Sequence, residues 1–193
     1  MTTASSSYIS ELQNISPSSI IELFELKLNQ DLHGTAETRY FHNGSSLNLN
    51  QEIIWNNNSY QRFPVQVEGF EYKGGQLPRP TLTVSNATGF MSALLINVNE
   101  TTAGNDLIGA IFTRRRTNVK FLSNDNFFGD NPSGAVDESV EDAKQIFTVA
   151  RKSTENREIV QFELAAALDM ANVRCPNRIC TRKDFPSIGT FVG

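Results

Sequence analysis

The sequence predicts a mainly β protein, an antiparallel β-barrel or β-sandwich with few short helices. Short runs in which apolar and polar residues alternate recur along most of the chain, and the run with Phe24, Leu26 and Leu28 is a clear example. Turn-forming pairs such as Asn43-Gly44 and Gly74-Gly75 separate these runs. About eight such runs with little convincing helix are typical of an antiparallel sandwich or barrel.

The N-terminal part begins with a polar arm, residues 1–19, in which a short helix is predicted from Tyr8 to Asn14. Arms of this kind usually become ordered against a partner. A half-buried strand is predicted to follow from Ile20 onward, because its residues alternate between apolar and polar. Further on, Ile53–Trp55 and Tyr60 enclose a run of asparagines and predict a hairpin between two strands.

The central part contains one segment whose structure the sequence leaves open. Val65 and Val67 continue the alternation on the second arm of the preceding hairpin. Pro80 is expected to open the next strand, since proline cannot donate a hydrogen bond within a sheet. The segment from Gly89 to Val98 fits a short helix and a strand equally well.

The last third predicts a strand, a loop and a final hairpin. Leu107–Leu122 alternates around three adjacent arginines and predicts a strand. Ser123–Ser139 is rich in Asn, Asp, Gly and Ser, which indicates a long surface loop. Ile146–Ala150 and Ile159–Leu164 then form the two arms of a wide hairpin.

The chain of 193 residues is long enough for one sizeable core. We therefore assign residues 1–19 to an N-terminal arm, 20–174 to one β-rich domain and 175–193 to a C-terminal extension. The predicted core consists of the apolar members of the alternating runs: Phe24, Leu26, Leu28, Val65, Val67, Leu82, Val84, Phe162 and Leu164.

Composition argues against two classes of partner. The net charge is −4, so there is no overall basic field to hold a nucleic acid, and specific nucleic-acid binding is not expected. No apolar run approaches the roughly 20 residues of a membrane-spanning helix, and no membrane contact is expected. The protein is expected to function in the cytosol or in a particle assembled there.

Residues for enzymatic chemistry are hard to identify, and no enzymatic activity is expected. The two histidines, His33 and His42, lie in no catalytic motif and are interpreted as ordinary surface or strand-end residues. The acidic residues between 125 and 142 lack the spacing of a calcium-binding loop. Cys175 and Cys180 are interpreted as free thiols, because a zinc or iron–sulfur centre needs about four ligands. No catalytic, cofactor-binding or metal-binding residue is therefore assigned.

The candidate functional residues are Arg114, Arg115 and Arg116, the one compact basic patch of an acidic chain. In a strand, Arg114 and Arg116 point to one face and Arg115 to the other. A solvated strand face is one interpretation. The functional interpretation is a contact between subunits or with nucleic acid, and the contact between subunits is preferred because arginine is enriched at protein interfaces. In a contact between subunits the partners are carboxylates on a neighbouring subunit: Asp130, Asp137, Glu138, Glu141 and Asp142.

Three stretches carry a resemblance to a known family. The first runs through Gly69-Phe70-Glu71 and Arg79-Pro80-Thr81-Leu82-Thr83-Val84-Ser85-Asn86. The second is Leu107–Leu122 with Arg114-Arg115-Arg116-Thr117, and the third is Val160–Asp169. In this order they resemble the phage minor tail protein L family of lambda-like long-tailed phages.

The resemblance implies a structural protein of the virion at the distal end of the tail, assembled in the host cytoplasm. Its fold would be a β-barrel of tail-hub type. It would lie between the ring of distal tail proteins and the central hub or tail fibre protein, and it would help to close the tube. The implied assembly is a ring, a homotrimer first and a hexamer as the alternative, with the tape measure protein as a further candidate partner.

Longer members of the family continue into a cysteine-rich segment that holds an iron–sulfur cluster. Cys175 and Cys180 lie upstream of the expected ligand positions, so no cluster is expected, and the chain corresponds to the N-terminal portion of the family. Two alternative functions remain. One is an iron–sulfur protein whose cysteines come from several chains. The other is a receptor-binding or carbohydrate-binding module, suggested by the aromatic residues Trp55, Tyr60, Phe63, Phe70 and Tyr72.

Overall fold

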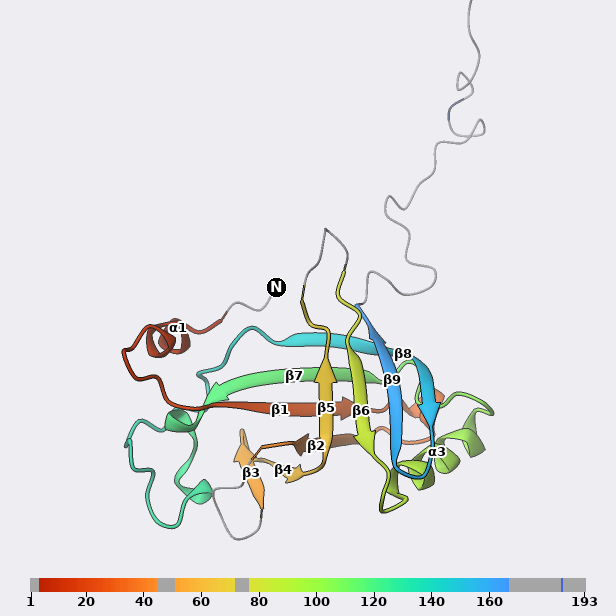
Figure 1. Ribbon diagram of the computed structural model, residues 1–193, viewed down its shortest axis with the longest axis horizontal. Coiled ribbons are helices and arrows are strands. Elements are labelled where there is room, and N and C mark those ends of the chain that lie inside the picture. Colours follow the sequence, from red (N-terminus) through yellow and green to blue (C-terminus); the bar gives the residue numbers. More distant parts are fainter. Residues whose placement is uncertain (1–3, 45–50, 72–76, 167–184, 186–193) are drawn as a thin grey trace, which may run out of the picture.

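The computed structural model describes residues 4–44, 51–71, 77–166 and 185 (Figure 1). The helices are α1 (Ser6–Leu12), α2 (Gln30–His33) and α3 (Phe90–Thr101), with two short 3-10 helices, η1 (Val119–Phe121) and η2 (Asn124–Asn126). The strands are β1 (Ile20–Lys27), β2 (Thr38–His42), β3 (Glu52–Trp55), β4 (Asn58–Arg62), β5 (Val65–Glu68), β6 (Thr81–Ser85), β7 (Ile111–Asn118), β8 (Gln145–Glu155) and β9 (Ile159–Ala165). The mainly β class predicted from the alternating runs is confirmed.

All of these strands belong to one sheet with the order β3-β4-β2-β1-β7-β8-β9-β6-β5. Neighbours are antiparallel except β2 and β4, which pair in parallel. The sheet is not closed, and β3 and β5 form its two edges. The prediction of a closed barrel is therefore wrong. The physical reason lies at Phe63-Pro64, where the chain leaves β4, so that Val65 and Val67 form the far edge of the sheet instead of extending the hairpin.

The sheet nevertheless folds over itself. In Figure 1, β5, β6 and β9 cross in front of β1 and β7. The long strand β8 makes this possible, because it pairs with β7 and with β9, and its pairing with β9 shifts register twice after Val149. Register shifts of this kind bend a strand and increase its twist. The two halves thus form crossed layers around a common core, as in an orthogonal sandwich.

The main core lies between these layers. Every residue of the predicted core is buried in it except Val67, which is partly buried and packs against it. The rings of Phe24 and Phe112 stack at its centre, with ring centres 5.7 Å apart. Three residues of α3, which are Met91, Leu95 and Val98, close one side. The segment that the sequence left open between helix and strand is therefore a helix.

A second core covers the opposite face of β1. Leu23, Ile53, Trp55, Tyr60 and Leu122 form it, so β1 buries residues on both faces. The predicted hairpin of β3 and β4 is confirmed. Asn56 and Asn57 form its turn, with positive φ values of 49° and 59°. The final hairpin of β8 and β9 and the short N-terminal helix are confirmed as well.

The segment predicted as a long surface loop is partly buried. Asn126 in this loop lies beside the edge strand β3, accepts a hydrogen bond from the Ile54 N–H (2.7 Å) and donates one to the Ile54 carbonyl oxygen (2.9 Å). Its side-chain amide thus takes the place of a neighbouring strand, which protects an otherwise open edge. Asn131 is also buried and donates to the carbonyl oxygens of Lys120 and Leu122.

Both histidines are buried rather than exposed. His42 ends β2, as expected for a strand-end residue, but its side chain is fully buried. His33 closes α2, where Nδ1 accepts the Asn29 N–H (2.8 Å) and Nε2 lies 3.2 Å from the Ile108 carbonyl oxygen. His33 therefore ties α2 to the turn that precedes β7. None of the helices in the described part of the chain has the length and apolar character needed to cross a membrane.

The burial of His42 predicts a pH-dependent stability. Burial, together with the charge of Arg62, lowers the pKa of His42 below its ordinary value of 6.5. The unfolded chain binds a proton below that pH while the folded chain resists it, so stability should decline as the pH falls below 6.5. We expect urea midpoints of the His42→Gln variant to change less between pH 7.5 and 5.5 than those of the wild type. Equal changes in the two proteins would show that His42 does not contribute.

Candidate functional site

The three arginines lie in β7, opposite β1. The antiparallel register pairs Glu22 with Arg116, Leu23 with Arg115 and Phe24 with Arg114. Because β1 is buried on both faces, the alternating arginines enter two different environments. The prediction that Arg114 and Arg116 share one face, with Arg115 on the other, is confirmed by the partners described below.

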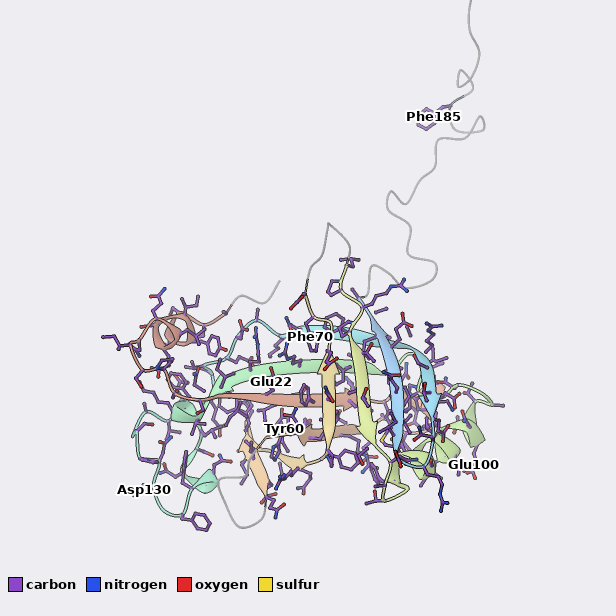
Figure 2. The ribbon with its side chains drawn as sticks, in the orientation of Figure 1. Glu22, Tyr60, Phe70, Glu100, Asp130 and Phe185 are labelled. Atoms are coloured by element: carbon purple, nitrogen blue, oxygen red, sulfur yellow. The ribbon has the colours of Figure 1, made fainter. Side chains whose placement is uncertain are left out.

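Arg114 is the most buried of the three, with 13% of its side chain exposed. It forms an ion pair with Glu22 and donates from Nη1 to Oε1 of Gln145 (3.0 Å). Its guanidinium carbon lies 4.1 Å from the ring centre of Phe70, which is a cation–π contact. Figure 2 labels Glu22 on β1 and Phe70, which follows β5. Arg114 thus connects the layer formed by β5, β6 and β9 to β1 and β7.

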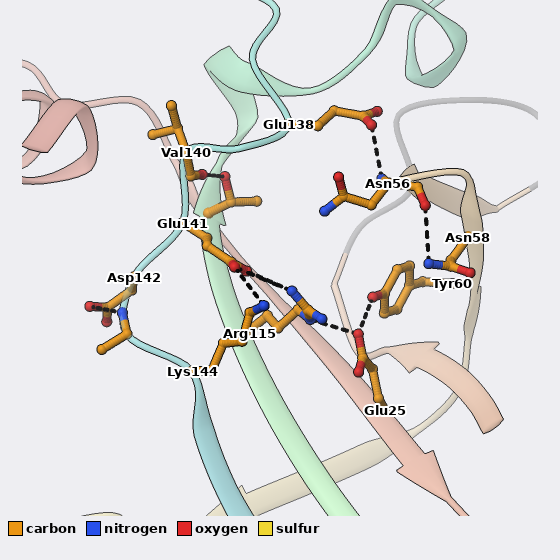
Figure 3. Close-up of polar contacts among 12 residues, drawn as sticks. Glu25, Asn56, Asn58, Tyr60, Arg115, Glu138, Val140, Glu141, Asp142 and Lys144 are labelled. Carbon is orange, nitrogen blue, oxygen red and sulfur yellow. Dashed lines mark hydrogen bonds and ion pairs between the residues drawn. The ribbon is translucent and has the colours of Figure 1, made fainter. Parts of the chain in front are cut away.

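Arg115 forms the centre of a charged network on the other face (Figure 3). Its Nε donates to Oε1 of Glu25 (2.6 Å), and its Nη1 donates to Oε2 of Glu141 (2.9 Å). Glu25 also accepts the hydroxyl of Tyr60 (2.7 Å), and Glu141 pairs with Lys144. The network therefore connects β1, β4 and β7 to the segment that precedes β8.

The network also changes proton affinities. Burial raises the pKa of Tyr60, and its hydrogen bond to Glu25 raises it further. Burial alone would lower the pKa of Arg115, but the hydrogen bond to Glu141 and the charge of Glu25 outweigh it and raise that pKa. Both effects favour the arrangement in which Tyr60 donates and Arg115 is charged. The network is therefore a fixed structural connection at neutral pH.

Arg116 is the most exposed of the three, with 33% of its side chain accessible. It pairs with Asp142, whose N–H donates in turn to the Arg116 carbonyl oxygen (2.9 Å). Both residues line an open cavity of about 430 Å³, together with Phe70 and Lys144. Of the three arginines, Arg116 is thus the most accessible to a second chain.

The structure brings the arginines together with carboxylates of their own chain. Glu141 and Asp142, which we expected to act from a neighbouring subunit, pair with Arg115 and Arg116 within the same chain. The other expected partners lie elsewhere in the loop, where Glu138 accepts the Asn56 N–H (3.0 Å). The contact between subunits stays a prediction, and it now concerns Arg116 above all.

Sequence reasoning missed Glu22, Glu25 and Tyr60 as partners of the arginines. In β1, Glu22 and Glu25 point to opposite faces of the sheet. This alternation was a local signal that β1 offers a carboxylate on each face. The pairing of β1 with β7 was not readable, because the two strands are far apart in the chain. The charge pairs across them could not be assigned without that register.

Within residues 4–44, 51–71, 77–166 and 185, no group of three or more His, Cys, Asp or Glu side chains is arranged to hold a metal ion. Cys175 and Cys180 lie outside the described residues. Among the aromatic residues, Trp55 and Tyr60 are buried in the second core, while Phe63 and Phe70 pack against the main one. Tyr72 lies outside the described residues.

A family model described as phage minor tail protein L matches residues 33–186. The tail tip protein L of Escherichia phage lambda is 30% identical over 124 residues, which are 64% of this chain and 49% of that protein. The chain therefore matches about half the length of this curated relative. The arginine cluster lies inside the matched residues, whereas α1 and β1 precede them.

Proposed function

This chain belongs to the phage minor tail protein L family, and we propose that it joins the distal ring of the tail tube to the central hub or tail fibre protein. The family is one of structural proteins of the phage tail tip. The observation that carries the proposal is the match over residues 33–186, which includes every strand except β1. In this role the protein acts by binding its neighbours and helps to close the tube.

The architecture supports a structural role of this kind. A single sheet packs on both faces, and charged side chains connect its layers through Arg114 and Arg115. Such a body can transmit force along a tail without changing shape, because packed cores resist deformation. Its edge strand β5 and its exposed apolar side chains are candidate contacts with other subunits.

The proposed partners are the distal tail protein on one side and the hub or fibre protein on the other, with the tape measure protein as a further candidate. We propose that several copies form a ring, since closed cyclic symmetry is the usual solution for identical subunits. A homotrimer is the first choice and a hexamer the alternative. Symmetry-averaged images of isolated tails distinguish the two, and a single copy per tail would contradict both.

The joining role has a direct test. Phages that lack the protein are complemented with a chain carrying an N-terminal affinity tag, and the tails are labelled with gold. We expect the label at the distal end, and we expect tails without the protein to lack the hub or fibre. Label along the tube or at the head end, or complete tips in its absence, would contradict the proposal.

A test of the arginine cluster uses charge reversal at its most exposed member. Arg116→Glu should reduce the amount of the protein in isolated tails if Arg116 forms a salt bridge with a neighbouring subunit. Since exposed pairs contribute only about 0 to 1 kcal/mol each, a large loss requires a contact that is shielded in an interface. The matched control is Arg151→Glu, because Arg151 is 70% exposed and also pairs within its own chain. If the two variants are incorporated into tails equally, Arg116 pairs only within its own chain.

A further inference from the structure

The helix α1 presents its apolar side chains to solvent. Tyr8 and Glu11 are its buried residues, whereas Ile9 and Leu12 are 46% and 43% exposed, and Ile15 just beyond the helix is fully exposed. A surface helix normally has the opposite arrangement, with its apolar side against the protein. An apolar surface that is held in place but left uncovered indicates a contact with another molecule.

The attachment of α1 to the body of the protein is specific. The carboxylate of Glu11 accepts hydrogen bonds from Lys120 Nζ (2.9 Å) and from the Ser18 N–H (3.1 Å). Tyr8 packs with Phe121 and Val140 in a small cluster of its own. Polar and aromatic contacts therefore fix the helix so that its aliphatic side chains point away from the protein.

The low charge of the segment around α1 is compatible with burial of this helix in an interface. Glu11 is the one charged residue between Ala4 and Ile21, and Lys120 neutralises it within the chain. The exposed side of α1 carries aliphatic, hydroxyl and amide groups. Such a surface can enter an apolar site without the cost of burying an unpaired charge.

An apolar cavity of about 300 Å³ lies on the other side of the proposed contact. It is bordered by β1, β2, β4, β6 and the beginning of α3, with Leu26, Phe41, Phe63, Val84 and Met91 among its walls. Phe90 at its rim is 42% exposed. A cavity of roughly 150 Å³ with apolar walls is large enough for benzene, so this one has room for two aliphatic side chains.

The lining of the cavity includes the charged side chain of Arg39. The guanidinium of Arg39 pairs with Glu37 and lies 5.7 Å from the ring centre of Phe90. Its Nε is buried and has no acceptor among the residues that the structure describes. That Nε is enclosed by its own chain, whereas the Arg39 side chain as a whole is 41% exposed, so the outer guanidinium nitrogens are the donors that the Ser10 hydroxyl or the Gln13 amide oxygen of α1 can reach.

The exposed side of α1 and the cavity lie in different parts of the molecule. Figure 1 shows α1 at the left end and α3, which borders the cavity, at the right end. They cannot meet within one chain, but they can meet between two copies. We propose that the exposed side of α1 inserts into the apolar cavity of a second copy of this chain.

In a contact of this type, each copy inserts its α1 into one neighbour and receives the α1 of another neighbour in its cavity. Copies joined in this way form a closed ring when the rotation between neighbours allows it. The inference therefore deepens the proposed function and rests on it, because it identifies the surfaces that hold the ring together. Since α1 precedes the matched residues 33–186, its side of the contact belongs to the part of the chain that the family model does not describe, whereas most walls of the cavity lie inside the match.

The test uses disulfide crosslinking in assembled tails. In a Cys175→Ser, Cys180→Ser background, the full chain carries Leu12→Cys together with Phe90→Cys, and the tails are oxidised. A disulfide requires Cα atoms within about 7 Å, so crosslinks between chains report direct contact. We expect a ladder of crosslinked chains that ends at the number of copies in the ring. The control pair, Leu12→Cys with Ile146→Cys, uses another exposed residue and should give at least about ten-fold less product.

Three outcomes would overturn the inference. The first is that tails contain the protein but show no more crosslinked product than the control. The second is that Leu12→Cys alone gives crosslinked pairs, and the third is that the disulfide forms within single chains. A protein that is absent from the tail tip would instead overturn the proposed function. As a second measurement, Leu12→Asp should prevent incorporation into tails, whereas Phe128→Asp, at a side chain that is 76% exposed, should not. Equal incorporation of these two variants would also contradict the contact.

Discussion

Replacing Phe162 with alanine is expected to lower the free energy of unfolding by about 3 to 5 kcal/mol. Phe162 is 1% exposed and pairs with Leu82 across β9 and β6, where it faces the main core. Its removal leaves a cavity between the two crossed layers, and the neighbouring strands cannot collapse into that space without loss of their register. Urea unfolding followed by circular dichroism measures the change.

Phe128→Ala is the control for this experiment. The side chain of Phe128 is 76% exposed, so the same chemical change removes almost no buried surface. We expect its unfolding free energy to stay within about 0.5 kcal/mol of the wild type. If Phe162→Ala were as stable as Phe128→Ala, Phe162 would not belong to the core, and the crossed arrangement of the sheet would be wrong at that position.

The core was predictable from the sequence because alternation is a local signal. In β1, β6 and β9, residues two positions apart share a face whatever the partner strand is, so Leu26, Leu82 and Phe162 were identified correctly. The closure of the sheet was not predictable in this way. It depends on the path of the chain after β4, and a single turn at Phe63-Pro64 separates β5 from its predicted neighbour.

The buried asparagines show a second limit. A segment rich in Asn, Asp, Gly and Ser indicates a surface loop by composition. Asn126 and Asn131 are buried all the same, because their amides satisfy backbone groups at the edge of β3 and near η1. A polar side chain can replace a missing strand, and composition alone does not distinguish this use from exposure to water.

The sequence predicted the orientation of the clustered arginines but not their partners. The alternation of β7 gave the directions of the side chains, but their partners depend on the pairing of β1 with β7, whose strands lie far apart in the chain. The excess positive charge of the cluster predicted carboxylates on another subunit as its partners. The chain supplies Glu22, Glu25, Glu141 and Asp142 itself, so adjacent arginines do not need a second molecule for neutralisation.

The second large effect is expected at Arg115. Arg115→Ala leaves the carboxylates of Glu25 and Glu141 close together without the cation that lies between them. Removal of one partner from a fully buried ion pair costs about 3 to 5 kcal/mol. Arg115 is 19% exposed, so water relieves part of this cost, and we expect a loss of about 2 kcal/mol in the free energy of unfolding.

Restoring the charge balance should recover much of that loss. In the Arg115→Met variant with Glu25→Gln and Glu141→Gln, the two carboxylates around position 115 are neutral, and an uncharged site of similar volume is often as stable as the ion pair that it replaces. Lys144 loses its partner Glu141, but its side chain is 30% exposed, so water solvates its charge. Arg151→Ala is the matched control, because Arg151 pairs with Glu163 at a side chain that is 70% exposed, and its loss should cost less than about 1 kcal/mol. Urea unfolding at pH 7 compares the four proteins. If Arg115→Ala and Arg151→Ala cost the same, the network in Figure 3 contributes no more than a surface ion pair, and β1, β4 and β7 are held together by backbone hydrogen bonds and apolar packing instead.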